Sequence, residues 1–256
     1  MNKVKVAIVG FGHLGRWHVQ KAEALETAQL VGIVEPTPAG QDRARAAHPE
    51  TSVFSSVDEV MDLVDAFVIV TPTSFHFEIA EKCIKAGKHV FIEKPMTSTS
   101  EQALKLKEAL GSQNKVIQVG HSERFHKVWD YRKDHPEFFE GKSTVRINRV
   151  APFKGRATDV DVVQDLMIHD LDLLLFLMGE VPTHVESTGY KMRTDKWDHV
   201  SSDFTFASGR RANITVGRNH IKEMRDVEIS CEHGCLFFDL FANKMMFADA
   251  KAQTDE

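Results

Sequence analysis

The chain has few cysteines, no long apolar run and no excess of positive charge. Its 256 residues include only three cysteines, Cys83, Cys231 and Cys235. An odd number of widely scattered cysteines argues against a disulfide framework. No uninterrupted apolar stretch approaches the roughly 20 residues that a membrane-spanning helix needs. The net charge of −5 gives no electrostatic reason to expect nucleic acid as the main partner.

The N-terminal sequence also lacks the marks of an export signal. Met1-Asn2-Lys3-Val4-Lys5 leads directly into a strand-like segment, without an apolar core and a small-residue cleavage site. We therefore expect a cytoplasmic protein without a membrane partner. An apolar share of 42% and a charged share of 27% are ordinary for a globular protein, and the length suits one large or two modest domains.

Cys231-Glu232-His233-Gly234-Cys235 holds two thiols and an imidazole, so a metal site is conceivable there. Zinc sites usually draw on two separated pairs of ligands, and only one such cluster is present. Glu232-His233-Gly234 also separates two apolar, strand-like segments. We therefore predict a hairpin at this position and no metal.

The first half of the chain alternates between strand and helix patterns, which predicts a parallel sheet with helices on both faces. The predicted strands cover residues 4–9, 30–34, 66–70, 89–92 and 116–119. The predicted helices cover residues 14–25, residues 42–47, a segment capped by Thr73 or Ser74 that ends near 86, and a segment that begins at the capping-box sequence 98–101 and ends before Gly111. We expect Gly87 to adopt the left-handed conformation that ends a helix.

The second half changes character, so we place the domain boundary at residue 120 and expect domains at 1–120 and 121–256. The predicted elements are a short helix near 128–133, a strand at 143–150, a long helix near 160–178, and strands at 185–190, 200–206, 212–216, 227–231 and 236–240. Consecutive strands with short turns indicate a largely antiparallel sheet, with the long helix covering one face.

Gly10-Phe11-Gly12-His13-Leu14-Gly15 fits the pattern G-x-G-x-x-G between a predicted strand and a predicted helix. In a dinucleotide-binding turn the first glycine permits the tight turn, the second lets the backbone approach the pyrophosphate, and the third lets helix and strand pack closely. The free N–H groups at the helix N-terminus would then bind the phosphates. The sequence therefore predicts a Rossmann domain, within an α/β fold, that binds a dinucleotide.

Glu35 ends the second predicted strand, 20 residues after Gly15. A carboxylate there accepts hydrogen bonds from the adenosine ribose and repels a 2′-phosphate, so we expect NAD in preference to NADP. Arg43 and Arg45 are close in sequence and weaken that preference.

Polar residues follow three further strands, at the edge where a Rossmann sheet presents its ligands. The cofactor candidates among them are Thr71, Pro72, Thr73, His76, Glu93 and Lys94, and the substrate candidates are Lys94, His121, Glu123, Arg124 and Phe125. A lysine held at a strand end can bind a substrate oxygen and stabilise negative charge that develops on it.

Asp165 and His169 are four residues apart on the long predicted helix, which places them on one face. An imidazole among apolar residues needs a partner, and a carboxylate one turn away can orient it and raise its basicity. His169 is therefore a candidate proton acceptor, with a structural histidine as the alternative.

In these motifs the chain resembles the Gfo/Idh/MocA family of NAD(P)-dependent oxidoreductases, which act mostly on sugars and sugar derivatives. The resemblance implies that Lys94, Asp165 and His169 are the catalytic residues. It also implies a Rossmann domain followed by an α+β domain with an open, largely antiparallel sheet, through which we expect a homodimer or homotetramer to form.

The stretches 119–125 and 159–170 look like the branch of this family that oxidises the 3-hydroxyl of UDP-N-acetylglucosamine for lipid A or surface polysaccharide precursors. This resemblance implies a UDP-sugar substrate, which His169 would also help to bind. Two alternatives stay open within the family, a free polyol or sugar such as inositol, and biliverdin. A third is a non-catalytic NAD(H)-binding regulator, although such a protein would need only the glycine turn and Glu35.

Overall fold

The computed structural model describes residues 2–155, 158 and 160–251. Its chain divides into two compact units, Met1–Gly120 and His121–Glu256, and each is described by itself. None of the helices formed by the described residues has both the length and the apolar content needed to cross a bilayer.

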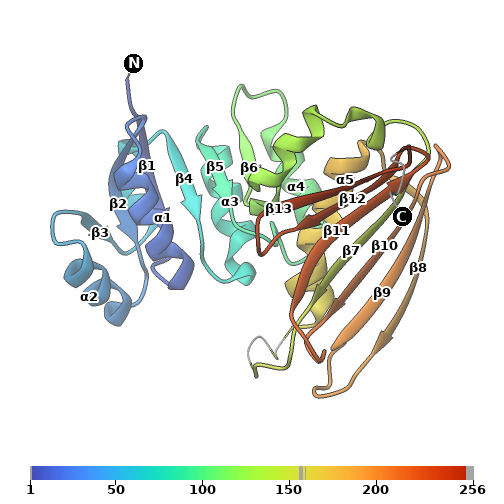
Figure 1. Cartoon of the computed structure of the whole chain (residues 1–256). Coiled ribbons are helices and arrows are strands. Elements are labelled where there is room, and N and C mark those ends of the chain that lie inside the picture. The colour runs from blue at the N-terminus through green and yellow to red at the C-terminus, as the bar shows by residue number, and fades with distance from the viewer. Residues whose placement is uncertain (1, 156–157, 159, 252–256) are drawn as a thin grey trace. The chain divides into compact units, whose positions relative to one another are not determined.

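The first unit is built on a six-stranded parallel sheet in the order β3-β2-β1-β4-β5-β6 (Figure 1). The strands are β1 (Val4–Val9), β2 (Ala28–Val34), β3 (Ser52–Phe54), β4 (Ala66–Ile69), β5 (His89–Ile92) and β6 (Ile117–Val119). The helices are α1 (His13–Ala24), α2 (Pro38–Ala47), α3 (His76–Lys85) and α4 (Ser100–Leu110), with short 3₁₀ segments η1 (Val57–Leu63) and η2 (Thr73–Phe75). This is the Rossmann arrangement, in which the strand order reverses between β1 and β4.

Both faces of this sheet are buried, because β1 sends successive side chains to opposite sides. Val6 and Ile8 join one apolar core with Val19 of α1. Ala7 and Val9 join another core that contains Ile84 of α3 and Leu106 of α4. The predicted parallel, doubly wound sheet is therefore confirmed.

The predictions of helix ends and caps in this unit are partly confirmed. Gly87 has a φ of +70°, as predicted, and α4 ends before Gly111. The predicted cap of α3 is wrong, because η2 intervenes and Phe75 precedes the helix without a side-chain capping bond. Strand β3 and segment η1 were not predicted, because a three-residue strand and a short 3₁₀ segment give almost no periodic signal.

The second unit is a seven-stranded mixed sheet in the order β13-β12-β11-β7-β10-β9-β8. Its strands are β7 (Thr144–Val150), β8 (Pro182–Tyr190), β9 (His199–Phe206), β10 (Arg211–Gly217), β11 (Met224–Cys231), β12 (Gly234–Asp239) and β13 (Lys244–Asp249). Only the β7–β10 pair is parallel, so the predicted largely antiparallel sheet is confirmed. The predicted hairpin at Glu232-His233 is also confirmed, with Cys231 opposite Gly234, whereas β13 was not predicted.

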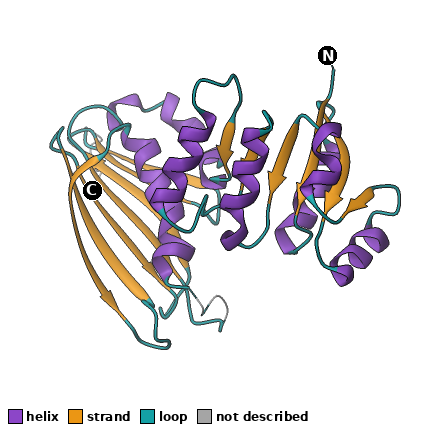
Figure 2. Cartoon of the chain, turned by 180° about the vertical axis from the view of Figure 1, so that it is seen from behind, coloured by secondary structure: helices purple, strands orange, loops and turns teal. Residues whose placement is uncertain are grey.

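Helical segments pack on one face of this sheet (Figures 1 and 2). They are η3 (Ser122–Phe125), η4 (Lys127–Lys133), η5 (Pro136–Phe138), η6 (Val163–Met167) and α5 (Ile168–Met178). Leu173 and Leu177 of α5 bury their side chains in one core with Ile147 of β7 and Ile214 of β10. The long helix predicted at 160–178 is thus present from Val163, but its first five residues, η6, form a π-helix.

A buried carboxylate, Asp198, anchors the loop between β8 and β9. Its side chain is fully buried and accepts backbone N–H bonds from Met192, Arg193 and Thr194 at 2.6–2.9 Å. Arg218 Nε donates to it at 2.7 Å, and an Arg218 Nη donates to the carbonyl of Val160, just before η6. Burial alone would raise the pKa of Asp198, but these hydrogen bonds outweigh it and hold the pKa well below its usual range.

We expect Asp198→Ala to lower the free energy of unfolding by about 3–5 kcal/mol, because the substitution removes the carboxylate that neutralises the buried guanidinium of Arg218. Asp195→Ala in the same loop is the control, since the Asp195 side chain is 84% exposed, and its effect should be at most about 0.5 kcal/mol. Urea unfolding would measure both, and equal effects would contradict the anchoring role.

The pH dependence of the same variants follows from the lowered pKa. A carboxylate whose folded pKa is depressed contributes stability above its ordinary value of 3.8 and loses that contribution as the pH falls below it. The stability gap between the wild type and Asp198→Ala should therefore be constant from pH 5 to 7 and should narrow below about pH 4.

Candidate functional site

The turn between β1 and α1 has the geometry of a dinucleotide-binding loop. Gly10 has a φ of +99°, and a Cβ there would lie 3.0 Å from the carbonyl oxygen of Val70. A Cβ on Gly15 would lie 2.1 Å from the carbonyl oxygen of Gly10, so helix and turn touch at this point. Both positions therefore need glycine for reasons internal to the protein.

Gly12 differs from these two glycines. No described atom lies within 4 Å of where its Cβ would stand, and its backbone angles are open to any residue. Gly12 also precedes α1 without a side-chain capping bond, which leaves the first N–H groups of the helix, including those of His13 and Leu14, directed outward. The open surface above Gly12 and these N–H groups fit the pyrophosphate of a dinucleotide.

This turn opens into a cavity of about 610 Å³ within the first unit. Six of the predicted cofactor residues line it, namely Gly10, Phe11, Gly12, Glu35, Thr71 and Pro72. Arg43 and Phe75 line it as well. From the sequence, Arg43 was noted only as a neighbour of Glu35. No sequence pattern indicated Phe75, because its position depends on the conformation of η2.

Glu35 lies at the end of β2 and is held firmly. Its carboxylate accepts hydrogen bonds from the backbone N–H of Phe11 at 3.0 Å and from the hydroxyl of Thr37 at 2.6 Å. Burial alone would raise its pKa, but these hydrogen bonds and the charge of Arg43 lower it. Glu35 therefore stays ionised and presents a fixed negative charge to this end of the cavity.

His76 connects the loops that follow β4 and β5. The side chain is 1% exposed, with Nε2 at 2.8 Å from the carbonyl oxygen of Thr71 and Nδ1 at 2.9 Å from that of Pro95. Each ring nitrogen therefore faces the carbonyl oxygen of a different loop. His76 thus holds the Thr71 turn and the Lys94-Pro95 turn, whose peptide bond is cis, at a fixed separation.

Glu93 is also bound within the unit. Its Oε1 lies 2.8 Å from Nε2 of His18 in α1, and its Oε2 accepts the N–H of Lys94 at 3.3 Å. Gly120 fits closely against it, since a Cβ there would lie 2.9 Å from the carboxylate. Glu93 therefore positions the half-buried Lys94 at the carboxyl end of β5. No sequence signal singled out His18, because its partner is 75 residues away.

In the second unit, Asp165 and His169 lie on either side of the junction between η6 and α5. Both side chains are half-buried. Short π-helical turns inside helices occur frequently at functional sites. The predicted long helix therefore does carry both residues, but through a local change of helical pitch that the sequence did not reveal.

A buried network of charges surrounds this helical junction. Asp170, next to His169, is fully buried. Its carboxylate accepts hydrogen bonds from Nε of Arg149 at 2.9 Å and from an Nη of Arg149 at 2.8 Å. Glu123 lies 3.4 Å from both Arg149 and Arg225. Burial opposes the charged form of Arg149, but Asp170 outweighs it and raises the pKa of Arg149. The structure thus gives Glu123 an internal role, and its predicted substrate contact stays a prediction.

The other candidates from 121–125 lie at the edge of this network. Arg124 makes a bidentate pair with Asp172 of α5, which raises the pKa of Arg124, and Nε2 of His121 lies 3.6 Å from the same carboxylate. The ring of Phe125 is 75% exposed. The η3 segment is therefore fixed to α5 by charge pairs while Phe125 faces outward.

The fold and these sites define an oxidoreductase with an NAD-binding Rossmann unit. The family model described as "Oxidoreductase family, NAD-binding Rossmann fold" matches residues 4–121, and the "GFO/IDH/MocA C-terminal domain" matches residues 138–237. The chain belongs to the Gfo/Idh/MocA family.

Several characterised proteins are similar to this chain. The UDP-N-acetylglucosamine 3-dehydrogenase of Acidithiobacillus ferrooxidans is 39% identical over 218 residues, which cover 85% of this chain and 68% of the relative. An inositol 2-dehydrogenase of Rhizobium meliloti is 26% identical over 84% of this chain and 69% of its own. A solved structure of the A. ferrooxidans enzyme superposes with a TM-score of 0.90 at 35% identity, covering 99% of this chain and 80% of that one.

A more distant structure shares the fold alone. The WlbA dehydrogenase of Bordetella pertussis, in complex with NADH and UDP-GlcNAcA, superposes with a TM-score of 0.86 at 22% identity, covering 99% of this chain and 79% of that one.

We expect Gly12→Ala and Gly15→Ala to separate cofactor binding from folding. Gly12→Ala should fold with a loss of at most about 1 kcal/mol, as expected for alanine before a helix, but should bind NADH at least about tenfold more weakly because the methyl group occupies the pyrophosphate surface. Gly15→Ala should lower the thermal midpoint sharply, because its methyl group overlaps Gly10. Calorimetric titration and thermal unfolding would measure these effects, and unchanged NADH affinity in Gly12→Ala would contradict the assignment.

The charge of Glu35 predicts cofactor choice. Glu35→Gln keeps the shape of the side chain but removes the charge that repels a 2′-phosphate, and it leaves Arg43 beside the cavity. We expect the preference for NAD over NADP to fall by about tenfold, or about 1.4 kcal/mol. Glu26→Gln, at an exposed position, is the control. An unchanged ratio of the two dissociation constants in Glu35→Gln would show that the carboxylate does not select the cofactor.

Proposed function

We propose that the protein is an NAD-dependent dehydrogenase that oxidises the 3-hydroxyl of UDP-N-acetylglucosamine or a related sugar nucleotide to a ketone. The observation that carries this proposal is the 39% identity to the A. ferrooxidans UDP-N-acetylglucosamine 3-dehydrogenase over 85% of the chain, with Lys94, Asp165 and His169 all present. Such a product would serve lipid A or surface polysaccharide precursor synthesis. The inositol dehydrogenases among the relatives are only 26–29% identical, which makes a free polyol the second candidate.

In the proposed reaction His169 accepts the proton of the sugar hydroxyl, and Asp165 orients the imidazole. Lys94 donates a hydrogen bond to the same oxygen and stabilises the negative charge that develops as the carbonyl forms. Bound NAD⁺ supplies the acceptor for the hydride that leaves the carbinol carbon. The C–H and O–H bonds break, the C=O bond forms, and NADH and one proton are released.

The remaining predicted residues take binding roles in this proposal. The cofactor would be held by the turn from Gly10 to Gly15, by Glu35, and by the Thr71–His76 and Glu93-Lys94 segments. His121, Arg124 and Phe125 would contact the substrate, and an exposed arginine edge suits a phosphate.

The two units divide these tasks in the proposal. Residues 1–120 would bind NAD, and residues 121–256 would bind the substrate and form a cytoplasmic homodimer or homotetramer through the sheet. In this proposal the interface would form on the face of that sheet opposite α5, which carries polar pairs such as Asn213–Asp203 and Arg146–Glu228.

Lys94→Ala and His169→Ala test the proposed chemistry. Each should lower kcat for NAD reduction with UDP-N-acetylglucosamine by about 10²–10⁴-fold, the range typical of a lost acid–base group, while NADH affinity in His169→Ala stays unchanged. His184→Ala, on an exposed position of β8, is the control. The proposal fails if both variants keep full turnover, or if the wild type oxidises inositol but no UDP-sugar.

A further inference from the structure

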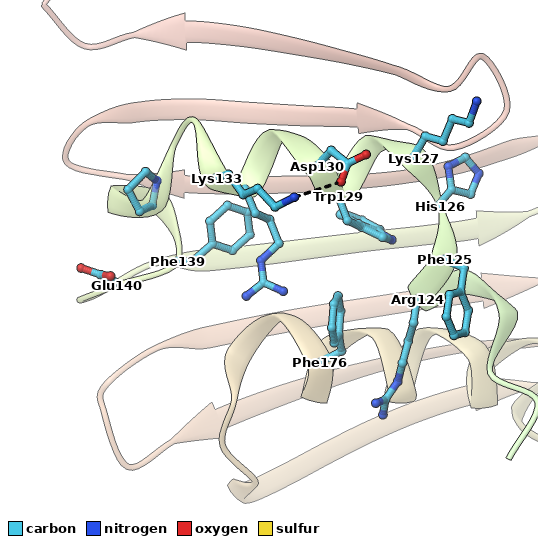
Figure 3. A pocket seen from close by; sticks show the side chains of 12 residues that line it. Arg124, Phe125, His126, Lys127, Trp129, Asp130, Lys133, Phe139, Glu140 and Phe176 are labelled. Atoms are coloured by element: carbon cyan, nitrogen blue, oxygen red, sulfur yellow. Dashed lines mark ion pairs between the residues drawn. The ribbon is translucent and has the colours of Figure 1, made fainter. Parts of the chain in front are cut away.

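A cationic, aromatic cavity of about 690 Å³ lies within the second unit, where η3, η4 and η5 face α5 (Figure 3). Its volume is in the range of pockets that bind small molecules. Among its lining residues, only Arg124 and Phe125 were predicted from the sequence as substrate contacts. None of the catalytic candidates Lys94, Asp165 and His169 lines it.

The guanidinium of Arg132 lines the cavity. It lies between two rings, 4.9 Å from the centroid of Phe139 and 4.8 Å from that of Phe176. Burial lowers its pKa, and no carboxylate opposes that effect. Within the described part of the chain the guanidinium makes neither an ion pair nor a hydrogen bond, because its contacts are with ring faces. Its N–H donors, at the edge of the plane, are therefore available to a ligand.

Arg124 shows the contrast within the same cavity. Its charge is neutralised by the bidentate pair with Asp172, although its guanidinium also lies 5.6 Å from the ring of Phe176. The structure thus provides a carboxylate for one arginine of this cavity and only aromatic rings for the other. A half-buried cation without a counter-charge is unfavourable, so an anionic ligand at Arg132 would be stabilised by a charge-assisted hydrogen bond.

The cavity as a whole carries positive charge on an acidic protein. Besides the neutralised Arg124, three cationic side chains line it, Lys127, Arg132 and Lys133, against the carboxylates of Asp130 and Glu140, whereas the chain has a net charge of −5. The Lys133–Asp130 pair is 3.6 Å long with both side chains about four-fifths exposed, so it neutralises little. Figure 3 shows this pair on η4, above the ring of Phe176.

Aromatic surface accompanies the charge. Phe125 is 75% exposed beside Arg124, and its ring is free to stack on a planar group. A ligand that combines anionic groups with a flat ring fits both features, and a planar guanidinium matches the paired oxygens of a phosphate. Those are the features of a nucleoside diphosphate.

The position of the cavity on α5 relates it to His169. Asp172 and Phe176 follow His169 by three and seven residues, so the three side chains lie on one face of the helix. Phe176 is about 10 Å further along the helix axis. A sugar bound at His169 could therefore extend its nucleotide along this face, past Arg124 to Arg132.

We propose that this cavity binds the nucleoside diphosphate part of the substrate, with Arg132 on a phosphate and Phe125 against the base. This inference rests on the proposed function for the identity of the sugar nucleotide. The binding chemistry itself, a nucleoside diphosphate at Arg132, is independent of whether the sugar is oxidised.

Calorimetric titration of the full chain with UDP tests the binding. Arg132→Met keeps the length of the side chain but loses its charge and donors, and we expect the UDP dissociation constant to rise at least about tenfold, the loss expected for a charge-assisted contact. Arg132→Lys should be intermediate, because it keeps the charge without the planar fork. Arg45→Met, at an exposed position of α2 outside this cavity, is the control and should bind UDP as the wild type does. Equal UDP affinity in Arg132→Met and Arg45→Met would overturn the proposal.

Phe125→Ala keeps the test decisive if Arg132→Met does not fold. An exposed ring contributes little to the core, and its loss should weaken UDP binding by about fivefold or more through lost stacking. Thermal unfolding would confirm that the variant is folded. Unchanged UDP affinity in folded Phe125→Ala would contradict the stacking assignment.

Kinetics distinguish the substrate from a separate nucleotide as the source of the diphosphate. If the cavity holds part of the substrate, UDP competes with UDP-N-acetylglucosamine, and Arg132→Met raises KM at least about tenfold with little change in kcat. Non-competitive inhibition by UDP that depends on Arg132 would overturn the assignment to the substrate. UDP binding that depends on Arg132 in a protein that oxidises no UDP-sugar would support the nucleotide site while refuting the proposed function.

Discussion

The pair between Arg149 and Asp170 is the interaction on which the arrangement of the second unit depends. It joins the middle of the sheet, at β7, to the first turn of α5, and it does so where neither side chain reaches solvent. Two charges removed from water are stable only when their geometry is good and their remaining hydrogen-bonding groups have partners. Glu123 and Arg225 extend the pair and bring in η3 and β11. His169 directly precedes Asp170, so the backbone of the proposed base is held in place by this buried pair.

The first unit uses its polar side chains in a similar way. His76 connects two loops through their carbonyl oxygens, and Glu93 connects α1 to β5 through His18. Glu35 accepts hydrogen bonds from the backbone of Phe11 and the hydroxyl of Thr37. Several residues that were predicted from the sequence as ligand contacts therefore also form hydrogen bonds within the protein. Such preorganisation lowers the entropy that binding must overcome, and it leaves Lys94 at a defined strand end.

The strands and helices with strong periodicity were predictable, and the short or irregular elements were not. β1 and β5 follow from short apolar runs, β9 and β10 from apolar alternation, and α4 from its capping-box sequence and the glycine at its end. β3 and η2 are too short to carry a periodic signal, and the cap of α3 was placed wrongly because η2 changed the local turn. The π-helix at Val163–Met167 was also missed, since the residues of a π-turn read like those of an α-helix.

By itself, the sequence determined the glycine turn, the acidic residue at the end of β2 and the alternation of strands and helices that makes a Rossmann unit. It also indicated Lys94, Asp165 and His169 as catalytic candidates. These are local signals, in which residue type and spacing carry the physical requirement. Only the tertiary structure decided that Glu123 is buried between two arginines, that His18 binds Glu93, and that Arg132 lies between two phenylalanine rings with its donors exposed. Each of these involves a contact with a side chain far away in the chain, such as Arg149 for Glu123, Glu93 for His18 and Phe176 for Arg132, and the sequence spacing does not indicate the contact.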